Sequence, residues 1–154
     1  PPELENLLQI TPYATDELAL VLPSTHKLSK AKELAKEDLY KLSFVSLDSQ
    51  STTRKVVDKL LKNSGLDIQR LKIEMELNSL EAIKNAVQSG LGAAFLPVVS
   101  IERELASGTI HKPSMSDLGV NRELKLITNP SRYTSKASEA FKRDILPQFS
   151  SFKN

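Results

Sequence analysis

The chain has 154 residues, of which 40% are hydrophobic, and it carries a formal net charge of +2. This length suits one domain or two small lobes, and the hydrophobic content is sufficient for a packed core. The near balance of 21 basic and 19 acidic residues does not by itself predict nucleic-acid binding. No apolar run approaches the roughly 20 residues of a membrane span. The absence of cysteine excludes disulfides and thiolate metal sites.

Short apolar runs alternate with polar turns in the first part of the chain. A strand is predicted at 17–22 and a second at 44–47, and the charged stretch between them is predicted to be loop with a short helix at 36–40. The polar turn 48–53 then begins a helix that stops at Ser64-Gly65. The apolar stripe of this helix consists of Val56, Val57, Leu60 and Leu61.

The most informative stretch lies between residues 71 and 97. Alternation of apolar and charged residues over 71–77 predicts a strand. Asn78 or Ser79 can cap the next helix, and Gly90 ends it where a left-handed residue is favoured. A short apolar run at 93–96 is typical of a buried strand, and Pro97 closes it.

The remainder of the chain continues the same alternation. A helix is predicted at 98–106, a loop at 111–121, a strand at 123–128 and a final helix at 135–149. The final helix carries Ala137, Phe141, Ile145 and Phe149 on one face. Strands that alternate with helices favour an α/β fold with a mostly parallel sheet.

In such sheets, ligands bind beyond the carboxyl ends of the strands. Two turns are expected at such ends: 48–53 after strand 44–47, and Asn78-Ser79 after strand 71–77. Both begin helices, so both offer free backbone N–H groups and the positive end of a helix dipole. The sequence therefore indicates an anion site, although Ser, Thr and Asn at these positions also suit ordinary helix caps.

Catalytic and metal-binding motifs are not found. His26 and His111 are isolated in loop-like segments and have no metal-ligand partner at suitable spacing. Gly90-Leu91-Gly92 follows a helix end, so it cannot cradle a phosphate as a P-loop does. No catalytic residue and no metal ligand is predicted, and no enzymatic activity is expected.

Several segments that together cover essentially the whole chain are similar to those of a known family. They are the block 76–97, the strand 16–23 with Thr25-His26, the Ser/Thr-rich loop 47–54, the helix 101–108, the strand 124–127 with Arg132-Tyr133, and Ala140-Phe141. In this pattern the chain resembles the effector-binding domain of LysR-type transcriptional regulators. Residues 74–90 and 129–133 resemble most closely the regulators of RuBisCO and inorganic-carbon genes in cyanobacteria and algal plastids.

The resemblance implies a two-lobed fold like that of type 2 periplasmic binding proteins, in which a small effector binds between the lobes. It implies that residues 17–121 form a complete second lobe and that the first lobe is only partly present. Residues 1–16 would be the end of a first-lobe segment, and residues 122–154 its return strand and helix. A periplasmic-type solute-binding protein shares this fold and is the alternative. A two-lobed catalyst would need an acid–base pair that the sequence does not show.

The resemblance also implies a ligand, partners and a location. The ligand-binding residues would be Ser49, Gln50, Ser51, Thr52 and Thr53 on the first turn, Asn78 and Ser79 on the second, and Phe95 and Pro97 along the cleft. The ligand would be a phosphorylated or carboxylate metabolite, and no other cofactor is expected. The chain would associate with itself, as a dimer or, at full length, a tetramer, partly through helix 79–89. It would reach DNA only through an N-terminal domain absent here, and would act in the cytoplasm or plastid stroma, not at a membrane.

Overall fold

The computed structural model describes residues 8–115, 118 and 120–149. The chain divides into two compact units, which are described separately: Glu17–Val120, and Pro1–Asp16 together with Asn121–Asn154. The assignment of these units to the second and first lobes remains a prediction. Among the described residues, no helix combines the length and apolar character needed to cross a bilayer.

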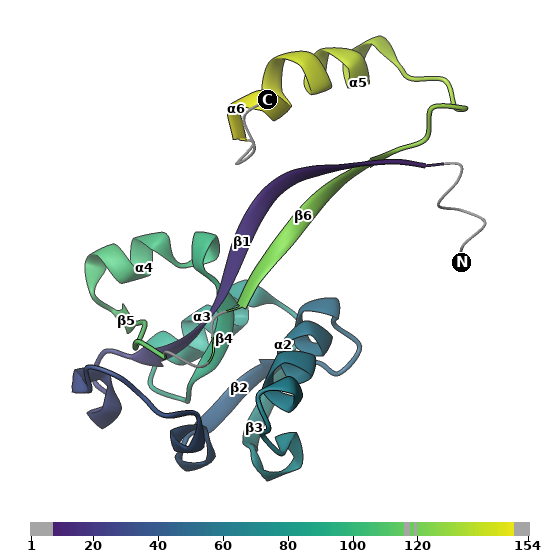
Figure 1. The fold of residues 1–154 in the computed structure, drawn as a ribbon. Helices are drawn as coiled ribbons and strands as arrows, with labels where there is room; N and C mark the ends of the chain where they lie inside the picture. The colour runs from purple at the N-terminus through teal and green to yellow at the C-terminus, as the bar shows by residue number, and fades with distance from the viewer. Residues whose placement is uncertain (1–7, 116–117, 119, 150–154) are drawn as a thin grey trace. The chain divides into compact units, whose positions relative to one another are not determined.

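The strands pair in both directions. β1 (Gln9–Pro23) pairs antiparallel with β4 (Ala94–Pro97) and with β5 (Ile110–His111). β2 (Ser43–Leu47) pairs parallel with β3 (Lys72–Leu77), and a parallel bridge joins β2 to the start of β4 (Figure 1). The prediction of a mostly parallel sheet is therefore wrong. An α-helix lies in the connections β2 to β3 and β3 to β4, as is usual between parallel strands, whereas β1 pairs antiparallel with β4 and β5.

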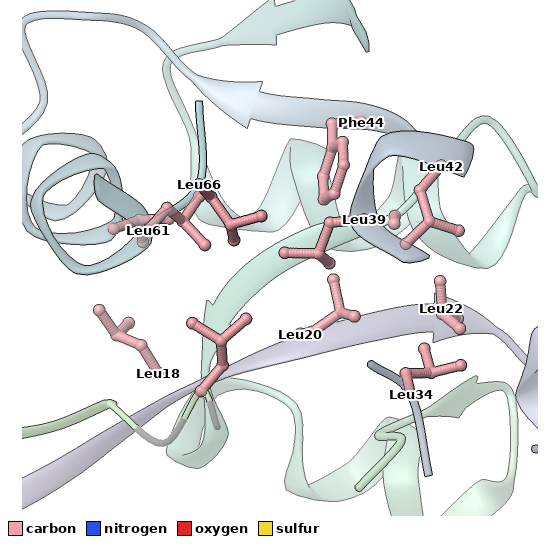
Figure 2. Packing of buried hydrophobic residues seen from close by; sticks show 12 residues of the cluster. Leu18, Leu20, Leu22, Leu34, Leu39, Leu42, Phe44, Leu61 and Leu66 are labelled. Atoms are coloured by element: carbon pink, nitrogen blue, oxygen red, sulfur yellow. The ribbon is translucent and has the colours of Figure 1, made fainter. Parts of the chain in front are cut away.

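Two apolar clusters form the interior of the larger unit. Leu18, Leu20 and Leu22 alternate along β1 and lie in one cluster, which also contains Phe44 of β2 (Figure 2). Val21, from the opposite side of β1, belongs to the second cluster. Burying each such side chain contributes roughly 1.5–3 kcal/mol. β1 is therefore the central element of this unit, with both faces covered.

Three α-helices of the larger unit follow the predicted pattern. They are α2 (Thr52–Asn63), α3 (Leu80–Gln88) and α4 (Glu102–Ser107), and each packs apolar side chains against one of the two clusters. Gly90 has a φ of 82°, which confirms the left-handed end predicted for α3. The predicted helix 98–106 is divided into a single 3-10 turn and α4. Ile101, the residue between these two elements, is fully buried. The short 3-10 helices are η1 (Lys27–Lys30), η2 (Lys36–Lys41), η3 (Ile68–Arg70) and η4 (Val98–Ser100).

The smaller unit is a strand ribbon followed by a helical segment. β6 (Val120–Thr128) pairs with β1. The helical segment consists of α5 (Lys136–Ala140), the π-helical turn η5 (Phe141–Ile145) and α6 (Leu146–Phe149), so the predicted helix 135–149 contains one wide turn. The hydroxyl of Tyr13 donates to the backbone oxygen of Leu146 at 3.2 Å and links β1 to α6.

Candidate functional site

The two predicted helix starts lie at one edge of the β2–β3 pair. Leu47 and Leu77, the last residues of β2 and β3, are register partners in this parallel pair. Directly beyond them, the backbone N–H of Asp48 donates to the backbone oxygen of Leu77 at 3.1 Å. The turn before α2 and the turn before α3 are therefore neighbours at the carboxyl edge, where ligands bind in open α/β sheets.

The first turn is ordered by its own hydrogen bonds. One carboxylate oxygen of Asp48 (Oδ1) accepts from the N–H of Gln50 at 2.9 Å, and the Asp48 backbone oxygen accepts from the N–H of Ser51 at 3.0 Å. Ser51 is the N-cap of α2, and its Oγ accepts from the N–H of Arg54 at 3.5 Å. Ser49, Gln50 and Thr52 are exposed on this turn. Hydroxyl and amide donors are thus presented at the edge.

The second turn supplies a similar set of groups. Ser79 is the N-cap of α3, and its Oγ accepts from the N–H of Ala82 at 3.4 Å. The hydroxyl hydrogen of a capping serine is still able to donate to a ligand. Asn78 precedes the cap and is exposed. Both predicted roles, helix cap and ligand donor, are compatible at Ser79.

Three of the predicted residues lie nearer the interior. Phe95 is half-buried and stacks on Phe44, with ring centroids 6.1 Å apart and planes 5° from parallel. Thr53 and Phe95 line a cavity of about 30 Å³ beneath α2, which is too small for a metabolite. Pro97 is buried at the end of β4. Seven of the nine predicted residues therefore lie on the two turns or in the first turn of α2, while Phe95 and Pro97 belong to packed strand.

Arg54, the basic residue nearest the first turn, is already engaged. Its Nε donates to Asp58 at 2.8 Å, and its Nη1 lies 3.3 Å from a carboxylate oxygen of Glu76. Nη1 also donates to the Ser46 hydroxyl at 2.7 Å and to the backbone oxygen of Leu47 at 3.1 Å. Only 15% of the side chain is exposed. Arg54 therefore connects α2 to the ends of β2 and β3.

Asp48 is the edge residue that sequence reasoning omitted. The signal was available, because Asp directly after a strand and before Ser and Gln is typical of a turn in which the side chain accepts a backbone hydrogen bond. No metal site competes with this interpretation: in the described part of the chain, no three His, Cys, Asp or Glu side chains gather as they would around an ion.

Comparison with known proteins identifies the family. Residues 1–150 match the LysR substrate binding domain, and the chain belongs to this family. It is 59% identical over 150 residues to a probable RuBisCO transcriptional regulator of Synechocystis, covering 97% of this chain and 44% of that protein. It is 56% identical over 149 residues to a probable RuBisCO transcriptional regulator of Porphyra purpurea, covering 97% of this chain and 47% of that protein.

Two solved structures share the fold. The regulatory domain of Synechocystis CcmR in complex with 2-PG has a TM-score of 0.80 at 20% identity, with 94% of this chain and 68% of that chain covered. The effector binding domain of QuiR in complex with shikimate has a TM-score of 0.75 at 24% identity, with 96% and 68% covered. The chain spans about half the length of the curated relatives it matches.

Proposed function

We propose that the chain is the effector-sensing domain of a LysR-type regulator of RuBisCO and related carbon-fixation genes. The effector is a small anionic metabolite that binds at the edge formed by the two turns. The observation that carries the proposal is the 3.1 Å hydrogen bond from Asp48 N–H to the Leu77 oxygen, which joins two helix starts at one strand edge. The similarity to regulators of RuBisCO supports this function over that of a periplasmic solute-binding protein.

The physical case for an anion is the donor set. Each helix start contributes roughly 0.3–1 kcal/mol toward a negative group, and more if the site is partly buried. Hydrogen bonds from hydroxyl or amide donors to a charged ligand are worth about 1.5–3 kcal/mol before desolvation. Thr52 and Ser79 are the donors on which the proposal depends most. The ligands bound by the two structural neighbours, 2-PG and shikimate, are both small acids, which supports this class of effector.

Effector binding would regulate the whole protein through thermodynamic linkage between the effector site and a second binding site. An effector-dependent coupling of about 1–3 kcal/mol is enough to change occupancy at a second site. In this proposal, the DNA contacts and the dimer or tetramer belong to the whole regulator, and DNA is bound through a part not contained in this chain. Such a regulator acts where its genes lie, in a bacterial cytoplasm or an algal plastid stroma.

Calorimetric titration of the full-length regulator with 2-phosphoglycolate and with sugar phosphates tests the proposal. Thr52→Val removes a donor and keeps the side-chain shape, and Ser79→Ala removes the second hydroxyl. Each variant is expected to weaken binding about tenfold, because each loses one hydrogen bond to a charged group. Basal DNA binding should be unchanged.

Ser135→Ala is the matched control, because Ser135 caps α5 through the same kind of bond, from Ser138 N–H at 3.2 Å, in the other unit. If Thr52→Val and Ser79→Ala both bind as tightly as the unaltered regulator, Thr52 only begins α2, Ser79 only caps α3, and the proposed edge is wrong.

A further inference from the structure

The chain passes between its two compact units at two points, and both lie on strands that pair with each other. The first passage falls between Asp16 and Glu17, within β1. The second falls between Val120 and Asn121, at the start of β6, which pairs with β1. Any change in the arrangement of the units must be absorbed by the backbone at these two points, as it is at the hinges of other two-part proteins.

An ion pair joins the two strands beside these passages. The Nε of Arg122 donates to Asp16 Oδ2 at 2.7 Å, and Nη2 of the same guanidinium contacts the same oxygen. The side chain of Asp16 is 4% exposed and that of Arg122 is 27% exposed, so the carboxylate is almost entirely shielded from solvent. Both residues belong to the smaller unit. The pair therefore fixes the offset of β1 against β6 where the chain leaves this unit.

The geometry of this pair is incomplete. Asp16 Oδ1 is buried and, among the described residues, it is the one buried side-chain nitrogen or oxygen that no donor reaches. A buried acceptor without a hydrogen bond raises the free energy of the state that contains it, and such atoms are rare in native proteins. An arginine fork commonly places two N–H groups on the two oxygens of a carboxylate, whereas here both contact Oδ2. A complete, forked pair needs a different offset of the two strands.

We infer that Asp16 and Arg122 are positioning residues that couple effector binding to the arrangement of the two units. In the described state the guanidinium holds one carboxylate oxygen, and in the effector-bound state it holds both. This inference rests on the proposed function and deepens it. The second hydrogen bond favours the effector-bound offset of β1 and β6, which adds to the preference of the effector for that state. The pair needs no contact with the effector itself.

Arg122→Lys separates the two forms of the pair. A lysine ammonium keeps the positive charge and still contacts one oxygen, but it lacks the planar fork that holds two. The variant should therefore retain the described state and destabilise the effector-bound one. A residue that serves only to hold the smaller unit together would affect both states equally.

The assay is calorimetric titration of the full-length regulator with 2-phosphoglycolate, or with ribulose 1,5-bisphosphate where the unaltered regulator binds that sugar phosphate more tightly. Arg122→Lys should raise the Kd of the probe about tenfold, as expected for one lost hydrogen bond to a charged group. The melting temperature and the DNA affinity of the probe-free regulator should stay as they are in the unaltered protein.

Glu17→Gln is the matched control. Glu17 is the next residue of β1, and its carboxylate accepts from Lys112 Nζ at 2.7 Å, but both side chains of this pair are more than a third exposed and both residues lie in the larger unit. The substitution removes an ion pair beside the same passage without touching the buried one. The Kd of the probe should change less than twofold, as expected for an exposed pair.

The inference is overturned if Arg122→Lys lowers the probe-free melting temperature and leaves the Kd unchanged, or if Glu17→Gln raises the Kd as much. A crystal structure of the full-length regulator with the probe bound gives a direct test: Arg122 should contact both oxygens of Asp16, and contact with Oδ2 alone would overturn the inference. The proposed function stands in these cases if Thr52→Val and Ser79→Ala weaken binding. If the unaltered regulator binds neither probe, the inference and the proposed function both fail.

Discussion

Replacing Arg54 with methionine should destabilise the larger unit by about 2 kcal/mol. The guanidinium donates to two neutral acceptors, the Ser46 hydroxyl and the Leu47 backbone oxygen, each worth about 0.5–1.5 kcal/mol. Its pairing with Asp58 four residues along the helix adds about 0.3–0.5 kcal/mol. Glu76 adds little, since that side chain is 47% exposed. Methionine retains the apolar stem, so the loss is mainly that of the hydrogen bonds.

Urea unfolding of the chain, followed by circular dichroism at low protein concentration, measures this loss. Lys55→Met is the control, because Lys55 is the next residue, is exposed and has no ion pair among the described residues. A surface change of this kind should alter the free energy of unfolding by less than about 0.5 kcal/mol. A double-mutant cycle with Asp58→Asn isolates the ion pair from the other two bonds.

The reasoning is refuted if Arg54→Met alters the free energy of unfolding no more than Lys55→Met does. It is also refuted if Arg54→Met leaves stability intact but weakens effector binding tenfold in the full-length regulator. The second result would mean that the guanidinium contacts the effector and is not held by Asp58 and Glu76.

Two further predictions concern parts of the chain away from the edge. The pKa of Glu104 is lowered chiefly because Lys84 donates a hydrogen bond to it, so this pair stabilises the fold above the ordinary glutamate pKa and its contribution is lost as pH falls through the lowered value. Lys84→Met should flatten the acid side of the stability–pH curve measured by thermal unfolding, and an unchanged curve would count against the pair. The isolated chain should also self-associate through Phe141 and Ile145, which are 51% and 41% exposed. Sedimentation should show dimers that Phe141→Ser weakens, whereas a clean monomer at high concentration would contradict this prediction.

Local sequence patterns predicted a helix or strand correctly where its cap, apolar stripe or terminal residue lies within or beside that element. The cap and apolar stripe of α2, the alternation in β3 and the glycine end of α3 all lie within a few residues of one another in sequence, and the structure confirms them. The two turns could be placed at one edge for the same reason. One turn follows β2 and the other follows β3, and α2 connects these two parallel neighbours, so their carboxyl ends meet.

Sequence reasoning failed where partners are distant in the chain. The first half of β1 was not predicted, because Pro12 and its polar neighbours weaken a strand pattern. Its pairing with β6 joins segments roughly a hundred residues apart in sequence. The direction of β1 against β4 is likewise set by long-range pairing, and it makes the sheet mixed. The contacts of Arg54 could not be predicted, because Ser46, Leu47, Asp58 and Glu76 come together around it only after folding.

The distribution of apolar burial explains why the smaller unit was harder to interpret than the larger one. Among its described hydrophobic residues, only Ala14 is buried, whereas Leu124, Ile127, Phe141 and Ile145 are all more than 40% exposed. A two-stranded ribbon is marginally stable in water without a covering layer. Tyr13, and the ion pair between buried Asp16 and partly exposed Arg122, hold this unit together by polar contacts. Such contacts leave no periodic signature in a sequence, so only the apolar face of its helix could be predicted, and Ala137, Phe141 and Ile145 of that face are exposed.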